Sequence, residues 1–265
     1  MYNPMKVVSL NVALPLTQCY GGQEVLTGGA KKPVPRAMLR LDNFDGDGQA
    51  DRVNHGGPDK AVCIYPFDHY AYWEETLGRE LSPGAFSENL TVSGALETEV
   101  CIGDVFRIGE ATVQVSQPRM PCNKLAGKNA ERLLTRWVAQ TGYTGFYTRV
   151  LSEGMVAAGD PFECVERHPD RISTADVNDV IYERSHDLGL IERLAGLPEF
   201  TADGRALFAQ RAEFLQQQQV NEKGAVRVAP RGESNEIQEP SGRRRPVELA
   251  VFYDRAGTDK TCVNL

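Results

Sequence analysis

The chain has 265 residues, of which 41% are hydrophobic and 25% are charged, and its formal net charge at pH 7 is −7. These values are ordinary for a globular protein with one substantial domain and a smaller one. The negative charge argues against general binding to a nucleic-acid polymer. No apolar run approaches the roughly 20 residues that span a membrane, and no convincing signal peptide is seen. We therefore expect a cytoplasmic protein without membrane contact.

The first 168 residues are predicted to be mainly β. Short strands joined by glycine-rich turns are expected at 6–12, 36–41, 62–65, 89–92, 104–108, 112–117, 145–151 and 162–165. The strands at 104–108 and 112–117 are expected to form a hairpin around Gly109-Glu110. Two helices are expected, at 66–76 and 125–140. This pattern predicts an α+β fold whose main part is a closed or nearly closed β-barrel over residues 1–168.

A different pattern follows His168. Ser173-x-x-Asp176 is a capping signature, and helical spacing continues through 187–197 and 204–219. We expect a small three-helix domain over 169–219, packed on itself or on the barrel because such short helices are not stable alone. Residues 220–265 are rich in Gly, Pro, Glu, Ser and Arg and are predicted to be a disordered tail, in which 247–253 could form one strand.

The stretch 42–61, DNFDGDGQADRVNHGGPDKA, resembles a calcium loop in its first half. Counting from Asn43, Asp45, Asp47 and Gly48 fit the pattern, but position 12 is Asn54 instead of a bidentate Glu. No helical pattern flanks the loop. Calcium is therefore disfavoured, and a solvated glycine turn remains an alternative. If the loop binds an anion instead, Asp45, Asp47 and Asp51 are expected to point to solvent, because they would repel a phosphate.

The second half of the same stretch, NHGGPDKA, indicates an anion site. Gly56 and Gly57 allow close backbone approach with their N–H groups directed at a ligand. Asn54, His55 and Lys60 add further donors just before a strand. The loop suits an anion or a polar ring system better than a cation.

Cys122 is the strongest candidate for chemistry. It follows a strand and two prolines and directly precedes a helix, so the positive end of the helix dipole favours its thiolate. Arg119 and Lys124 flank it, and Asn123 lies between the cysteine and Lys124. A thiolate there is a nucleophile or a soft-metal ligand. The other cysteines are predicted to be free thiols, with Cys63 and Cys101 as filler in apolar strands.

Basic residues continue beyond Cys122 at i, i+4 spacing. For Arg132 and Arg136 a solvated helix face is the simpler explanation, whereas Lys124 and Lys128 are close enough to Cys122 to meet a phosphate. The region forms an anion pocket comparable to those that hold pyridoxal phosphate.

Several long motifs, in order, resemble the MOSC-domain proteins of the YiiM type. They are GDGQADRVNHGGPDKAVCIY, FSENLTVSG, CIGDVFRIGEATVQVSQPRMPCNKL and GYTGFYTRVLSEGMVAAGD, within residues 5–219. Ser87 departs from the family pattern, which has Gly there.

The resemblance implies a molybdenum cofactor (molybdopterin), an anionic pyranopterin dithiolene whose metal is bound by Cys122. It also implies reduction of N-hydroxylated compounds, including toxic base analogues, to amines with two electrons and two protons releasing water. His55 would take part in catalysis. Cofactor binding would involve Asn54, His55, Gly56, Gly57, Lys60, Arg119, Asn123 and Lys124. Since no flavin, nicotinamide or iron–sulfur pattern is present, an external flavin or iron–sulfur reductase is expected as electron donor.

Two alternatives remain. The first is a binding module that carries the cofactor, or a persulfide on Cys122, without turnover. The second is a Cys122–His55 thiol hydrolase, for which the sequence offers no orienting third residue.

Overall fold

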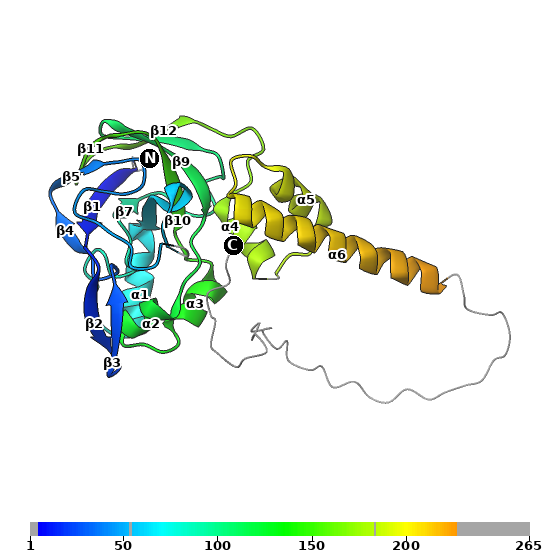
Figure 1. Cartoon of the computed structure of the whole chain (residues 1–265), viewed down its shortest axis with the longest axis horizontal. Coiled ribbons are helices and arrows are strands. Elements are labelled where there is room, and N and C mark those ends of the chain that lie inside the picture. Colours follow the sequence, from blue (N-terminus) through cyan, green and yellow to red (C-terminus); the bar gives the residue numbers. More distant parts are fainter. Residues whose placement is uncertain (1–4, 53–54, 183, 227–265) are drawn as a thin grey trace.

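The computed structural model describes residues 5–52, 55–182 and 184–226, and of residues 222–226 the backbone alone (Figure 1). Its centre is an eight-stranded sheet with the strand order β12-β8-β9-β10-β6-β7-β1-β4. The pairs are antiparallel except β6 and β7, which are parallel. The strand bounds are β1 Lys6–Val12, β4 Lys32–Val34, β6 Val62–Pro66, β7 Leu90–Ser93, β8 Val105–Ile108, β9 Ala111–Pro118, β10 Phe146–Ser152 and β12 Phe162–Glu166.

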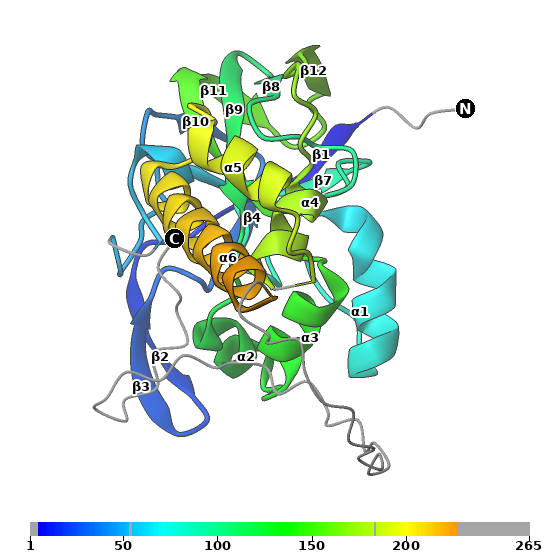
Figure 2. The same cartoon turned by 90° about the vertical axis from the view of Figure 1, so that its right-hand side faces the viewer.

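Two smaller sheets accompany the large one. A hairpin of β2 (Leu16–Tyr20) and β3 (Gln23–Thr27) protrudes from one end of the molecule in both views (Figures 1 and 2). The other pair joins β5 (Arg36–Leu39) to β11 (Gly154–Ala157). The sequence patterns did not predict β2, β3, β4 or β11, which are short or largely exposed.

The mainly-β, α+β class is confirmed. The prediction was a closed or nearly closed barrel, and the described residues do not form a closed one. The start of β1, which is the strand next to the end strand β4, meets the segment just before β12 at an isolated bridge between Lys6 and Pro161, supported by the hydrogen bond from Val7 N to Asp160 O of 2.9 Å. Further along, β1 pairs with β4 from Leu10 to Val12 on that edge. One edge of β1 pairs with β7. On its other edge β4 occupies the second half of β1, so only the start of β1 can meet the far end of the sheet.

The predicted hairpin around Gly109-Glu110 is confirmed. Ile108 pairs with Ala111, which leaves two residues in the turn. Gly109 has φ +55°, a conformation that favours glycine. Local turn chemistry and alternation therefore set this pairing.

Six α-helices lie within the described ranges. They are α1 Tyr70–Leu77, α2 Asn123–Asn129, α3 Leu134–Thr141, α4 Thr174–Ile181, α5 Leu188–Gly196 and α6 Ala202–Val226. The helix predicted over 66–76 starts later than expected. Pro66 is the last residue of β6, and a 3-10 turn, η2 (Phe67–His69), precedes α1.

The single helix predicted over 125–140 is wrong, because the chain breaks it into α2 and α3. Ala130 takes a left-handed conformation with φ +52° and ψ +30°, and its N–H bonds back to the carbonyls of Ala126 and Gly127. A left-handed residue of this kind ends a helix. The break lets α3 turn back toward α2, which it contacts.

Three helices follow residue 168, as predicted, and Ser173 and Asp176 form the expected capping box at the start of α4. Their apolar residues share one continuous core with the sheet: Ile172, Val177, Ile191 and Phe208 belong to the same buried cluster as the strands. Helix α6 continues to Val226, so the prediction that the tail is disordered from residue 220 is wrong for residues 220–226. Residues 227–265, including the strand predicted at 247–253, lie outside the described residues.

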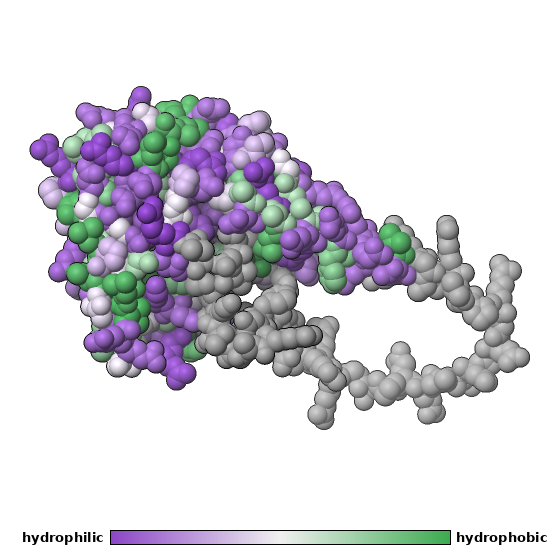
Figure 3. Space-filling view, in the orientation of Figure 1, coloured by the Kyte–Doolittle hydropathy of each residue, from purple (hydrophilic) through white to green (hydrophobic). Residues whose placement is uncertain are grey.

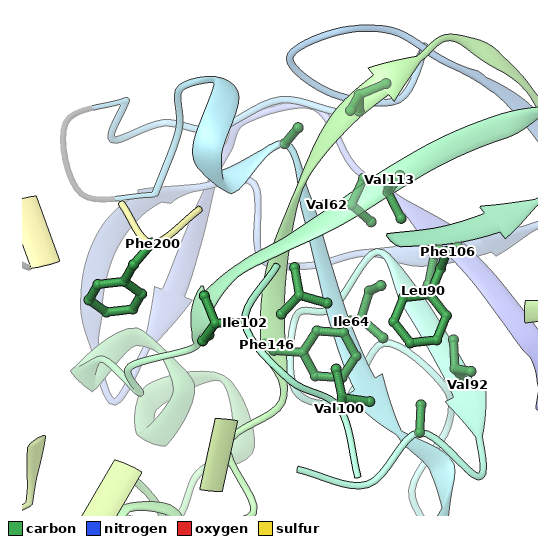
Figure 4. Close-up of a cluster of buried hydrophobic side chains, with 14 of the residues drawn as sticks. Val62, Ile64, Leu90, Val92, Val100, Ile102, Phe106, Val113, Phe146 and Phe200 are labelled. Carbon is green, nitrogen blue, oxygen red and sulfur yellow. The ribbon is translucent and has the colours of Figure 1, made fainter. Parts of the chain in front are cut away.

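Strands β6 to β10 supply most of the sheet's buried side chains. Figure 4 shows Val62, Ile64, Leu90, Val113 and Phe146 converging from these strands on one interior. The face of the molecule in Figure 3 is largely polar, with hydrophobic residues in separate small patches. No helix of the described residues is long and apolar enough to cross a membrane.

A second buried cluster lies under α1. Tyr65 stacks on Phe86 with ring centroids 4.1 Å apart, and Trp73 Nε1 donates to the Tyr65 hydroxyl at 2.6 Å. Leu125 of α2 and Leu134 of α3 complete the cluster. This packing fixes the two helices next to the strand end that carries Arg119 and Cys122.

Candidate functional site

A pocket opens at the end of the molecule where the β2–β3 hairpin, α2 and the loop before β6 come together. It encloses about 670 Å³ of empty space, part of it open to solvent. Five segments of the chain contribute lining residues, with Tyr147 of β10 behind them: 27–31 at the end of β3, 48–51, 55–63, 87–89 and 119–125. Residues far apart in the sequence thus meet at one site.

Cys122 lies in this pocket at the position directly before α2, with an extended backbone of φ −115° and ψ 164°. Its residue surface is 9% exposed. Burial raises the pKa of the Cys122 thiol. A hydrogen bond and the charge of His55, the Arg119 guanidinium and the backbone amide of Lys124 outweigh burial and lower the pKa from 9.0 to about 7. These contacts therefore favour the thiolate form of Cys122.

Arg119 faces the same pocket from the end of β9. Its backbone N–H donates to Gly145 O at 2.9 Å, which fixes the strand end beside β10. The residue is 5% exposed, and its Nη1 atom has no hydrogen-bond partner among the described residues. Burying an unsatisfied guanidinium N–H is unfavourable. The pocket therefore contains an open donor suited to an anionic or polar ligand.

The donor loop reaches the pocket in part. His55 and Lys60 line it, and the 3-10 turn η1 (Pro58–Lys60) is anchored by Arg149 Nε, which donates to Asp59 Oδ1 at 2.8 Å. Gly56 and Gly57 precede that turn but are not among the lining residues. Gly57 has φ +91°, which suits glycine.

The other predicted cofactor residues are distributed as follows. Lys124 lines the pocket, whereas Asn123 is exposed and does not line it. Asn54 lies outside the described residues.

The prediction that Asp47 points to solvent is wrong. Its carboxylate is fully buried: Oδ1 accepts from Ala13 N at 2.9 Å and from Lys31 Nζ, and Oδ2 accepts from Asn89 Nδ2 at 2.9 Å. Asp45 is exposed, as expected, and pairs with Arg40. Asp51 lines the pocket, which also differs from the expectation. The apparent calcium loop is thus folded around a lysine ammonium of the same chain.

Cys63 also lines the pocket, although its apolar strand suggested simple filler. Burial raises the pKa of its thiol to about 11, with Arg119 opposing, so the thiol is neutral. Its neighbour Tyr147 is hydrogen-bonded to Arg119. Alternation along β6 would have indicated which face Cys63 occupies, but not that this face borders a pocket.

Lys128 does not face the pocket, contrary to its expected role at a phosphate. Its Nζ donates to Gly29 O at 2.7 Å, to Gly84 O and to Ser87 Oγ at 3.3 Å. Ser87 has φ +64°, which explains why glycine suits this position. Lys128 therefore ties α2 to two loops, one of which forms the pocket wall.

The fold agrees with what comparison with known proteins finds. The MOSC domain family matches residues 51–163. The crystal structure of YiiM from Geobacillus stearothermophilus superimposes with a TM-score of 0.68 at 38% identity, covering 79% of this chain and all of that one.

Proteins similar in sequence indicate the same family. The uncharacterized protein YflK of Bacillus subtilis (strain 168) is 51% identical over 210 residues, 79% of this chain and 95% of that protein. Protein YiiM of Escherichia coli (strain K12) is 42% identical over 151 residues, 52% of this chain and 67% of that protein. A protein of Gibberella moniliformis named reductase is 36% identical over 149 residues, which span 26% of its length. The chain belongs to the MOSC-domain proteins of the YiiM type.

Proposed function

We propose that this protein is a molybdenum-cofactor-dependent reductase of N-hydroxylated compounds, including toxic N-hydroxylated base analogues. The observation that carries the proposal is the pairing, in one pocket, of the acidic thiol of Cys122 with the buried guanidinium of Arg119, whose Nη1 has no hydrogen-bond partner among the described residues. A soft anionic sulfur beside open cationic donors suits a thiolate-binding metal on an anionic organic group.

The charge of the pocket fits such a cofactor. Among the described residues, four cationic side chains line it against the single carboxylate of Asp51, in a chain with a net charge of −7, and one of the four, Lys31, is paired with Asp47 behind the pocket. The four are Lys31, Lys60, Arg119 and Lys124. Such a concentration of positive charge favours a phosphate-bearing ligand. When bound, the molybdenum cofactor supplies the two-electron chemistry that removes oxygen from an N–OH group.

The chain's own residues have separate roles in this proposal. Cys122 Sγ binds the metal, and Arg119 and the lysines hold the anionic part of the cofactor. His55 hydrogen-bonds to Cys122 from the adjacent loop, so its imidazole can hold a proton beside the reacting centre. The overall reaction takes two protons and two electrons and forms an amine and water. We assign one of the proton deliveries to His55.

The electrons come from a separate flavin or iron–sulfur reductase in this proposal, and the substrate is a small molecule. The relative named reductase supports the reaction class. The cofactor or sulfur-carrier module remains the second candidate, because the same thiol and cations would serve a carrier.

The test is metal analysis and turnover of protein purified from a host that makes the molybdenum cofactor. We expect about one molybdenum per chain, loss of the metal in Cys122→Ser, and full retention in Cys101→Ser, whose thiol is buried outside the pocket. A hydroxyl is a poor substitute because it is hard and hardly ionised.

Turnover separates the two candidates. Reduction of hydroxylaminopurine with a chemical reductant, but not with NADPH alone, supports the reductase. Bound molybdenum without turnover by any donor supports the carrier, and a Cys122→Ser variant that keeps both metal and activity refutes the site.

A further inference from the structure

Asp47 and Lys31 form a buried ion pair behind the pocket. The side chain of Lys31 is 7% exposed and that of Asp47 is 0% exposed. The carboxylate also accepts from Ala13 N and Asn89 Nδ2, both at 2.9 Å. A carboxylate with three donors, one of them charged, is well compensated for its loss of water.

This pair occupies the part of the chain that resembles a calcium loop. The carboxylate that would bind a divalent cation instead holds an ammonium, and Asn43 Nδ2 donates to the Asp47 backbone carbonyl at 3.1 Å. The cation bound by this loop is thus the ammonium of Lys31, which lies 16 residues before Asp47 in the chain.

The position of Lys31 has a consequence for the pocket. Lys31 lies at the end of segment 27–31, which forms one wall, and is itself a lining residue, whereas Asp47 is not. An ammonium has three N–H groups. Asp47 accepts one of them, and the structure gives no second partner to this ammonium among the described residues. Because Lys31 is a lining residue whose side chain keeps 7% of its surface exposed, we infer that a ligand in the pocket can reach the remaining donors.

Segment 27–31, the wall that carries Lys31, is also held in place by hydrogen bonds and close packing. Gly29 N donates to Thr27 Oγ1 at 2.9 Å, and Gly29 O accepts from Lys128 of α2 at 2.7 Å. Gly28 packs so closely that an added Cβ would lie 2.0 Å from Gly48 O. Lys31 therefore projects from a rigid wall.

We propose that Lys31 is an anion-binding residue of the pocket and that Asp47 is the positioning residue that holds its ammonium at the wall. This inference rests on the proposed function in that the anion is the phosphate-bearing cofactor. It adds a cation from a segment that the sequence motifs around His55 and Cys122 do not include.

Two measurements test the role of Lys31. The first is the rise in melting temperature of cofactor-free protein in inorganic phosphate compared with chloride at equal ionic strength, because a ligand that binds the folded state stabilises it. The second is the molybdenum retained by holoprotein after gel filtration. We expect Lys31→Met to weaken phosphate binding about tenfold, the size of one charge-assisted hydrogen bond, and to retain less molybdenum.

Three further variants separate positioning from general folding. Lys31→Arg keeps the charge and should restore most of the binding. The double variant Lys31→Met/Asp47→Asn should bind phosphate better than Lys31→Met, because it does not leave a buried, unpaired carboxylate near the anion. Asp45→Asn, two residues from Asp47 in an exposed pair with Arg40, is the matched control and should behave as wild type.

Phosphate binding and metal retention by Lys31→Met equal to wild type would overturn the inference. An equal loss in Asp45→Asn would also overturn it. If Lys31→Met does not fold, Lys31→Gln carries the same comparison. Wild-type protein that never holds molybdenum would count against the proposed function, while the phosphate measurement on cofactor-free protein would still decide the role of Lys31.

Discussion

The ammonium of Lys128 donates a 2.7 Å hydrogen bond to the carbonyl oxygen of Gly29 and so joins the helix that follows Cys122 to a wall of the pocket. The same ammonium donates to Gly84 O and to Ser87 Oγ. Oxygen atoms from two loops thus surround one buried cation, and none of the three acceptors carries a formal charge. The three acceptors hold the ammonium at the wall, whereas burial opposes the charged form of the lysine.

The first prediction concerns stability against pH. Burial lowers the pKa of Lys128 from 10.5 to about 8, although Glu88 opposes this. Between these two pH values the unfolded chain holds a proton that the folded chain has released. The contribution of Lys128 to folding stability therefore rises with pH across this window, by about 1.4 kcal/mol per pH unit at its steepest.

Urea unfolding of wild type and Lys128→Met from pH 7 to pH 10.5 measures this contribution. The difference in unfolding free energy, wild type minus variant, should be constant below pH 7 and increase from about pH 8 upward. Cofactor-free protein should be used, since a bound anion would favour the charged lysine. A difference that stays flat or falls with pH would contradict the assignment.

The second prediction concerns the reactivity of Cys122. Because the pKa of this thiol is lowered to about 7, its alkylation by iodoacetamide in cofactor-free protein should have a midpoint near pH 7. His55→Ala removes the hydrogen bond and charge that lower the pKa, and burial then dominates, so the midpoint should move upward by at least about one unit. The rate is followed by mass spectrometry of the Cys122 peptide.

Cys63 serves as the internal comparison in the same digest. The pKa of its thiol is raised to about 11, so its peptide should remain unmodified at pH 7. Equal labelling of the two cysteines, or an unchanged Cys122 midpoint in His55→Ala, would show that His55 does not tune the thiol.

The third prediction concerns the C-terminal helices. Phe208 of α6 is fully buried and stacks on Phe200 with centroids 5.5 Å apart and rings 13° from parallel. Phe208→Ala should lower the unfolding free energy by about 3–5 kcal/mol, because it leaves a cavity in the core shared with the sheet. The free energy is measured by urea denaturation.

Phe214, on the same helix, provides the matched control because it is 61% exposed. Phe214→Ala should change the unfolding free energy by no more than about 0.5 kcal/mol. Two separate unfolding transitions, with Phe208→Ala affecting one alone, would show that the helices form an independent unit.

Local chemistry determined much of the fold from the sequence alone. Alternation and a two-residue turn predicted the β8–β9 hairpin, and Ser173 with Asp176 predicted the start of α4. In both of these the interacting groups lie within a few residues of one another. The position of Cys122 before a helix predicted a lowered thiol pKa from its neighbours along the chain. The direction is confirmed, but the largest lowering cause is His55 of a distant loop, ahead of Arg119 and the backbone amide of Lys124.

Tertiary structure decided the rest. The pairing of Asp47 with Lys31 and Asn89 spans 16 and 42 residues, and the placement of Cys63 in the pocket depends on which strand borders it. The break after α2 lies at Ala130, an exposed residue with high helix propensity, and the Asn129 side chain before it is bound by Ala85 O and Arg79 from a distant segment. A local sequence pattern shows which chemical groups a segment contains. The pairing of buried charges is decided only when distant segments pack together and exclude water.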